Sequence, residues 1–414
     1  MSKIRVKNFG PIKEGYSHND GWLDINKVTV FIGNQGAGKS TVAKLISTFV
    51  WIEKVLVRGN YDTKWFERKG INRFKSQFLP YHRLDAYLYP ESIIEYRGDA
   101  YSIVYQNERL IINEIPNNSY SLPQIMYVPA ERNFLTYIKG AKELKLSSEA
   151  LQEFNTEYYN AQQDMKGSLE MPINDTIIEY DKLNDTLNLK GENYKVKLTD
   201  ASSGFQSFVP LYLVSQYLAN SVSRHNENKE SMSSEEKIRF QKQVQGIWDN
   251  NGFTEEQKRF ALSALSEKFN KTAFINIIEE PEQNLFPSSQ WKMLQSLLAF
   301  NNMNNSNKLM LTTHSPYIIN YLTILIKAKQ VFDTLSNDKK ETFYSTISNR
   351  ISIDSCINAD DVSIYEMEEK TGIIKTLQKY NDLIPSDDNF LNNMLAETNN
   401  LFAKLQEIEE ENEN

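Results

Sequence analysis

The sequence is poor in residues that cross-link a fold or bind a metal. Its single cysteine, Cys356, rules out an internal disulfide and fits a reducing compartment. The four histidines are scattered and no Cys-x-x-Cys pair occurs, so the spacing of zinc sites is missing. The longest apolar run, Tyr317 to Ile326, is too short to cross a bilayer, and the first residues do not resemble a signal sequence. We therefore expect a cytoplasmic protein with no membrane partner.

Positive charge is also in short supply: 46 Lys and Arg residues face 54 Asp and Glu residues, a formal net charge of −8. This balance argues against a protein that binds nucleic acid over its whole surface. One block differs, because residues 54–83 contain eight basic residues among several aromatic ones. The block predicts either a surface for DNA, RNA or an acidic partner, or a solvated helix face. Its basic residues are Lys54, Arg58, Lys64, Arg68, Lys69, Arg73, Lys75 and Arg83.

Residues 33–41 carry the most informative pattern in the chain, GxxxxGK[ST], between an apolar β-branched run at 28–32 and a helical pattern at 42–50. In a strand–loop–helix unit, glycines let backbone N–H groups face a phosphate, and the helix N-terminus adds positive charge. We predict that Lys39 reaches the β- and γ-phosphates of ATP and that Ser40 binds Mg²⁺. The predicted nucleotide-binding residues of this loop are Gly33, Asn34, Gln35, Gly36, Ala37, Gly38, Lys39, Ser40 and Thr41.

A pair of acids ends a second buried-strand pattern, residues 273–278. Glu279 is predicted to hold the hydration shell of Mg²⁺, and Glu280 to polarise the attacking water. Without the phosphate loop, acids at a strand end would be read equally well as surface residues. Together with that loop they indicate a catalytic pair.

A histidine follows the next apolar run, residues 308–313, within the sequence Thr-Thr-His-Ser-Pro. A lone histidine is usually structural. Because parallel strands end at one edge of a sheet, His314 is nevertheless expected near the acidic pair, where it can hydrogen-bond a γ-phosphate.

Small residues open a helical pattern at 201–207, read as Ala-Ser-Ser-Gly-Phe-Gln-Ser. By itself this is an ordinary helix N-cap. Its place between the phosphate loop and the acidic strand predicts instead an anion-binding helix N-terminus, formed by Ser202, Ser203 and Gly204.

These four motifs, in this order, resemble the ATP-binding-cassette (ABC) and SMC class of ATPases. Within that class, Glu-Glu-Pro-Glu and Thr-His-Ser-Pro are similar to the OLD-like branch (AAA_15/AAA_21), as are residues 8–12 and 128–132. The chain lacks the toprim domain of full OLD proteins, because no Asp-x-Asp pair follows His314. In more detail it resembles anti-phage defence ATPases such as AriA of PARIS or PtuA of Septu.

The resemblance implies an α/β fold of the ABC-type ATPase head, with a mixed β-sheet lobe, a parallel-sheet phosphate-loop core and a helical insertion. Residues 1–134 would form the lobe with the Walker A loop and a β meander over 92–115. Residues 135–271 would hold the signature in a helical subdomain, with insertion helices near 235–248 and 254–269. Residues 272–380 would carry the Walker B acids and the switch histidine. Residues 381–414 would form a helical, acidic tail with a frayed end.

The resemblance also implies a mechanism that needs two protomers. They would sandwich ATP head to head, so that Ser203 and Gly204 of one copy face Lys39 of the other. Glu280 would then activate water. Three positions depart from the wider family: Glu279 replaces an aspartate, Phe205 occupies the place of the signature glutamine, and Glu131 is the candidate metal ligand where a glutamine is expected. We expect slow ATP hydrolysis.

The leading functional expectation is an ATP-driven switch or scaffold of an anti-phage system, AriA-like first and PtuA-like second. It would form a homo-oligomer that responds to a phage-encoded trigger protein and controls a separately encoded effector nuclease or toxin. One alternative is a DNA repair or chromosome-associated ATPase of RecF or Rad50 type. An OLD-type nuclease is less favoured, because the toprim acids are missing.

Overall fold

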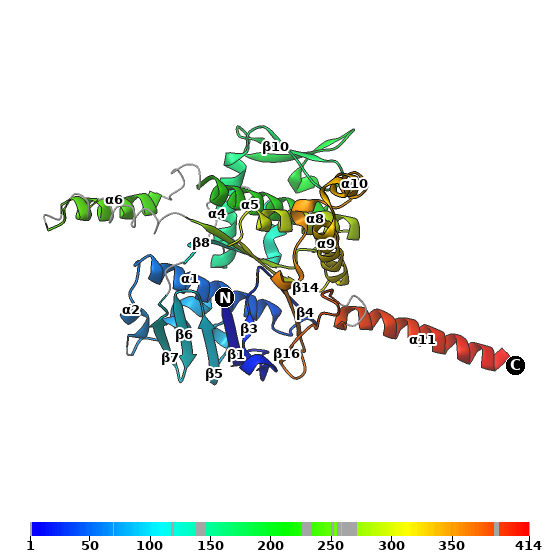
Figure 1. The fold of residues 1–414 in the computed structure, drawn as a ribbon, viewed down its shortest axis with the longest axis horizontal. Coiled ribbons are helices and arrows are strands. Elements are labelled where there is room, and N and C mark those ends of the chain that lie inside the picture. The colour runs from blue at the N-terminus through cyan, green and yellow to red at the C-terminus, as the bar shows by residue number, and fades with distance from the viewer. Residues whose placement is uncertain are drawn as a thin grey trace.

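The computed structural model describes residues 2–68, 70–116, 120–137, 146, 148–225, 234–249, 252–254, 258, 271–348, 350–384 and 389–413. Two large β-sheets enclose helix α1 (Lys39–Val57) (Figure 1). Within the described residues, no helix combines the length and hydropathy that spanning a bilayer requires.

The larger sheet has seven strands in the order β2-β16-β15-β4-β14-β13-β8, and those from β15 to β8 are parallel. Strands β4, β8 and β13 are buried along their whole length, which explains their continuous apolar sequences. Residues that follow these parallel strands therefore meet at one edge. The strands are β2 (Gly15–Tyr16), β4 (Val28–Gly33), β8 (Pro123–Val128), β13 (Ala273–Glu279), β14 (Lys308–Thr313), β15 (Val362–Met367) and β16 (Ile373–Thr376).

The second sheet is antiparallel, in the order β3-β1-β5-β6-β7, and confirms the predicted meander. Helix α1 fits between the two sheets because it is apolar on both sides. One apolar cluster joins its Phe49 to Tyr96 of β5 and Ile277 of β13. The strands are β1 (Lys3–Phe9), β3 (Leu23–Asp24), β5 (Leu88–Arg97), β6 (Tyr101–Gln106) and β7 (Arg109–Glu114).

Helices cover the opposite face of the seven-stranded sheet (Figure 1). A second apolar cluster there joins Val30 of β4 and Ile278 of β13 to Leu211, Leu294 and Leu322 of three helices. This layer confirms the predicted α/β class of an ABC-type ATPase head. Its helices are α4 (Glu149–Asp164), α5 (Ser203–His225), α8 (Pro287–Asn302) and α9 (Pro316–Thr334).

A small antiparallel sheet beside α4 confirms the short strands expected near 177, 187 and 196. The helical pattern predicted over 135–171 is only partly correct. Residues 130–137 form a 3-10 helix, η4, and 168–170 form a strand, because Leu169 pairs with Ile178 and cross-strand packing overrides helix propensity. The strands are β9 (Ser168–Glu170), β10 (Ile177–Asp181), β11 (Thr186–Lys190) and β12 (Lys195–Lys197).

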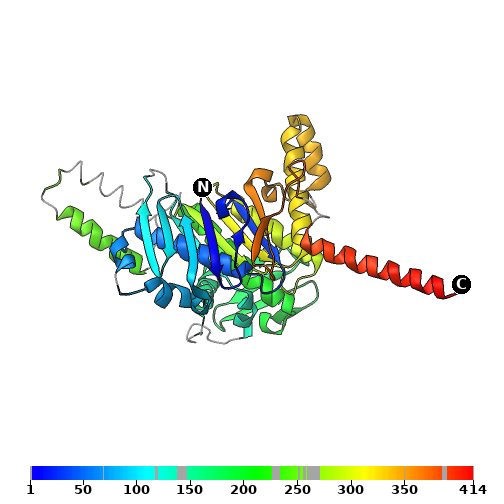
Figure 2. The ribbon, with the colours of Figure 1, turned by 90° about the horizontal axis from the view of Figure 1, so that it is seen from below.

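Two helices project from the body, α6 (Ser234–Trp248) and α11 (Phe390–Glu413) (Figures 1 and 2). Helix α6 confirms the first predicted insertion helix, whereas the second lies outside the described residues apart from positions 254 and 258. Helix α11 confirms a helical tail, and the frayed end expected for it stays a prediction. Other short elements include α2 (Thr63–Glu67), η2 (Phe74–Phe78), α3 (Leu79–Tyr81) and α10 (Asn337–Ile347).

Candidate functional site

The phosphate loop leaves β4 at Gly33 and enters α1 at Lys39. Gly33 has φ +145°, and a Cβ there would lie 2.3 Å from the carbonyl oxygen of Met367. Gly38 has φ +98° and caps the helix. Gly36, with φ +78°, has open space on its side-chain face. The first N–H groups of α1 have no acceptor within the helix, so the loop forms the cradle expected for a phosphate.

Lys39 lies across this loop and is 5% exposed. Its Nζ donates to the carbonyl oxygens of Gly33 (3.0 Å) and Asn34 (2.8 Å). Burial lowers the pKa of Lys39 to about 8, although Glu280 and neighbouring acids oppose this shift. The ammonium group is therefore held at the loop in charged form at neutral pH.

The acids and the histidine reach the same edge from the neighbouring strands. Glu280 follows β13 with φ +43°, and its N–H donates to the carbonyl of Thr312 on β14 (2.9 Å). Nε2 of His314 lies 3.6 Å from Oε1 of Glu280. Interaction with His314, supported by Lys39 and Arg132, holds the pKa of Glu280 below its usual value. Glu280 is thus an ionised, half-exposed carboxylate beside the loop.

Glu279 is 6% exposed and has several partners in its own chain. Oε1 accepts a hydrogen bond from the hydroxyl of Tyr127 and lies 3.6 Å from Nζ of Lys44, while Oε2 accepts from the N–H of Ala130 (3.3 Å). Within the described ranges, no three His, Cys, Asp or Glu side chains form a metal-binding group. The donors fit Mg²⁺ that is held mainly by phosphate and water, with Ser40 and one carboxylate.

Glu131, the third candidate ligand, is exposed at the start of η4 (Ala130–Tyr137), just beyond β8. Its neighbour Ala130 donates to Glu279. Glu131 therefore lies at the predicted edge of the sheet.

The predicted signature begins α5 but does not join the phosphate loop of its own chain. Ser202 and Ser203 are exposed. A Cβ on Gly204 would lie 2.8 Å from the carbonyl oxygen of Asn284, in the loop after the acids. Among the residues that the structure describes, none of the three forms a hydrogen bond or ion pair with residues 33–41. Phe205 is buried, which explains an apolar residue where the wider family has glutamine.

Arg132 belongs to the motif at residues 128–132, but the sequence alone predicts no role for it. It is fully buried, and burial lowers its pKa to about 10. Its guanidinium donates to the carbonyls of Pro129 (3.2 Å), Glu279 (2.7 Å), Glu280 (2.6 Å) and Ser207 on α5 (3.1 Å). Arg132 therefore ties the acidic loop to the signature helix. Its place in the Val-Pro-Ala-Glu-Arg sequence that follows the buried strand β8 is the signal that the sequence offers.

Glu282 was also missed. Its Oε1 accepts a hydrogen bond from the backbone N–H of His314 (2.7 Å), and burial raises its pKa. This third acid of Glu-Glu-Pro-Glu thus positions the histidine.

The basic block is only partly a surface. Arg58, Arg73, Phe66 and Phe74 are buried, and Arg73 lies 4.3 Å from the ring centroid of Trp65. Lys64, Arg68, Lys75 and Arg83 are exposed. Lys54 is partly exposed, so two of the seven described basic residues of the block are withdrawn from the surface.

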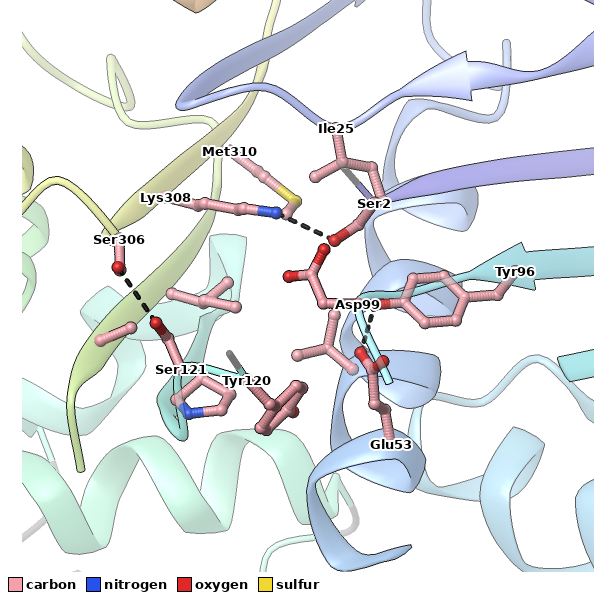
Figure 3. Close-up of a pocket in the computed structure, with 14 residues that line it drawn as sticks. Ser2, Ile25, Glu53, Tyr96, Asp99, Tyr120, Ser121, Ser306, Lys308 and Met310 are labelled. Carbon is pink, nitrogen blue, oxygen red and sulfur yellow. Dashed lines mark hydrogen bonds between the residues drawn. The ribbon is translucent and has the colours of Figure 1, made fainter. Parts of the chain in front are cut away.

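A separate cavity of about 120 Å³ lies between the two sheets at the N-terminal ends of the core strands (Figure 3). Buried Glu53 of α1 accepts from Tyr96 and from the N–H groups of Ala100 and Tyr101, and burial raises its pKa. Nζ of Lys308 donates to Ser2. This cluster joins α1 to the antiparallel sheet and lies at the opposite end of the strands from the phosphate loop.

The chain was compared with protein-family models, with curated proteins and with solved structures. The family model described as AAA ATPase domain (AAA_15) matches residues 60–319, more than half of the chain. The phosphate loop lies before that range and is a separate observation. No curated protein matches significantly.

Solved structures resemble the chain weakly. The SMC head domain from Thermotoga maritima matches with 10% identity and a TM-score of 0.37, over 91% of this chain and 98% of that chain. The ADP- and Pi-bound dimeric ATP-binding cassette MJ0796 matches with 10% identity and a TM-score of 0.30, over 92% and 100%. At these scores the likeness supports no functional argument.

Proposed function

The chain belongs to the AAA ATPase domain family, and from that premise we propose that it is an ATP-binding and ATP-hydrolysing switch. One observation carries this proposal: Lys39, Glu279, Glu280 and His314 leave three adjacent parallel strands and meet at one sheet edge. Membership of an ATPase family implies nucleotide binding, and the phosphate cradle supplies a place for it.

Each residue of the site has a role in this proposal. The loop N–H groups and Lys39 bind the β- and γ-phosphates. Ser40 and Glu279 are the groups that would hold Mg²⁺, which supplies charge neutralisation at the phosphates. Glu280, kept ionised by its lowered pKa, accepts the proton of the attacking water. His314 orients that water or the γ-phosphate, and Glu282 orients His314.

We propose that two copies form each site. Ser202, Ser203 and Gly204 open the 23-residue helix α5, yet they make no bond to their own phosphate loop among the described residues. An exposed helix N-terminus with small side chains attracts an anion. The γ-phosphate bound by a second copy would be that anion, so hydrolysis would loosen the pair and supply two states.

The biological role that we propose is control of a separately encoded effector nuclease in anti-phage defence, AriA-like first and PtuA-like second. The order of motifs and the Glu-Glu-Pro-Glu and Thr-His-Ser-Pro sequences support it. A chromosome or repair ATPase of RecF or Rad50 type fits the same family and would bind DNA in an ATP-dependent, steeply salt-dependent way. Phage plaque counts with and without the neighbouring gene, beside DNA-binding assays, distinguish the two roles.

The enzymatic proposal is tested with two substitutions. Glu280→Gln should retain ATP binding and lower the hydrolysis rate by about 100-fold or more, because the proton acceptor is lost. Lys39→Ala should lose binding itself. Glu192→Gln, at an exposed loop position, is the matched control and should hydrolyse ATP normally. Parent-like hydrolysis by Glu280→Gln would refute the assignment.

A further inference from the structure

Helix α11 leaves the body of the molecule (Figures 1 and 2). Its C-terminal half exposes an apolar stripe. Every residue from 396 to 409 is exposed. The exposed fractions are 62% for Leu401, 62% for Phe402, 64% for Leu405 and 53% for Ile408. A soluble chain seldom leaves such a contiguous stripe in water unless the stripe meets a partner.

The spacing of the stripe identifies the shape of that partner. In the sequence, residues 391, 394, 398, 401, 405 and 408 follow one another at alternating steps of three and four. This is the a/d repeat of a coiled-coil seam, which fits a second helix rather than a flat surface. Five of the six residues are apolar, and Thr398 is the exception.

We propose that α11 pairs with α11 of a second copy of this chain, in antiparallel orientation. With the pair centred between residues 399 and 400, Thr398 would face Leu401 of the partner subunit. Leu391 packs in part against the core of its own chain, so the seam would end where Ile408 of the partner subunit reaches it. Glu397 and Lys404, which flank the seam, would then form two identical ion pairs across it. A two-fold contact of this kind needs only one self-complementary surface.

Charge selects the antiparallel orientation over the parallel one. Residues 407–413 contain five glutamates and no basic residue. Parallel helices would bring both acidic ends together, whereas antiparallel helices separate them and also oppose the helix dipoles. Only the antiparallel pair also matches Glu397 with Lys404.

The base of α11 is anchored, so the stripe is presented in a defined direction. The N–H of Phe390 donates to Oε1 of Glu366 on β15 (2.7 Å), and Nδ2 of Asn392 donates to Oδ1 of Asn320 on α9 (3.4 Å). Glu366 pairs in register with Ile32, next to the phosphate loop. A two-fold contact through α11 and a second one across nucleotide would together link dimers into a larger assembly.

Sedimentation velocity of the full chain tests the α11 contact. Leaving out nucleotide removes the second, ATP-dependent contact between copies. We expect a concentration-dependent dimer that Leu401→Glu/Leu405→Glu converts to monomer, with at least a tenfold weaker self-association. Ala396→Glu/Ala403→Glu adds the same charge to the opposite face of the helix and should leave the dimer intact. A monomeric parent chain at about 50 µM, or equal behaviour of the two variants, would overturn the proposal. Far-UV circular dichroism and ATP hydrolysis check that the variants fold.

A charge swap tests the orientation. Glu397→Lys and Lys404→Glu should each weaken the dimer, and the double variant should restore it. Recovery instead with Lys404→Glu/Glu409→Lys would show a parallel pair and overturn the antiparallel assignment.

Discussion

Two helix N-termini with small residues in front of them differ sharply in this molecule. At α1 the loop is enclosed by the sheet edge, and a buried lysine and three acids converge on it. At α5 the two serines are exposed, and the nearest group is the carbonyl of Asn284. The first holds the charged groups of the site, and the second offers only backbone N–H groups and two serine hydroxyls. This difference supports our proposal that the second acts on an anion brought by another molecule.

The largest expected effect on ATP hydrolysis comes from substitutions at the two helix N-termini, tested separately and then as a mixture of the two variant proteins. Lys39→Ala and Ser203→Glu should each lower ATP hydrolysis by about 100-fold or more, since one removes the phosphate ligand and the other repels the phosphate. An equimolar mixture should regain about a quarter of parent activity, because random pairing leaves one intact site in half of the dimers. Ser168→Glu, an exposed serine elsewhere, is the control. A mixture that stays inactive contradicts a shared site.

Arg132 connects the two regions, and its loss should be the next largest effect. Arg132→Ala leaves four buried carbonyls without their donor and should destabilise the fold by about 3–5 kcal/mol. Thermal unfolding measures this loss. Arg68→Ala, at an exposed position, should change stability by less than about 0.5 kcal/mol. If both variants melt alike, Arg132 does not hold the acidic loop to α5.

Lys39 makes ATP binding at the N-terminus of α1 sensitive to pH. Because burial lowers the pKa of Lys39 to about 8, the free protein loses this charge as pH rises through 8. ATP binding restores the proton, so affinity should fall several-fold between pH 7 and pH 9, and binding at pH 8 should take up protons. The stability of the nucleotide-free protein changes with pH in the opposite direction to ATP affinity. Between pH 8 and about 10.5 the unfolded chain binds more protons than the folded one, so the free energy of unfolding rises with pH. Calorimetry in buffers of different ionisation enthalpy measures the uptake, and ATP binding at pH 8 without net proton uptake would contradict this assignment.

The smallest expected effects come from substituting one glycine at each terminus, Gly36 in the phosphate loop and Gly204 at the start of α5. Gly36→Ala meets open space but must adopt φ +78°, which costs about 1 kcal/mol. Gly204→Ala would instead press on Asn284 and shift the loop that carries the acids. We expect Gly204→Ala to lower hydrolysis more than its effect on the melting temperature predicts. Hydrolysis by Gly204→Ala that falls only as far as its melting temperature predicts would contradict this expectation.

The strands and the phosphate loop were predictable because their signals are local. Continuous β-branched runs indicate buried parallel strands, and the glycine spacing of 33–38 is required by the turn itself. Strand β9 was misread as helix, since the pairing of Leu169 with Ile178 depends on residues that only the fold brings together.

The candidate site shows the same division. The identities of Lys39, Glu279, Glu280 and His314 follow from motifs, because phosphate chemistry restricts which side chains can stand after each strand. The roles of Arg132 and Glu282 do not, since they depend on carbonyl and amide groups that any residue carries and that only folding aligns. Sequence alone thus determined which chemical groups are present and on which elements. Tertiary structure decided which backbone atoms hold them. Burying a charged side chain costs free energy unless it is hydrogen-bonded, and only the packed chain determines which donors or acceptors lie beside it.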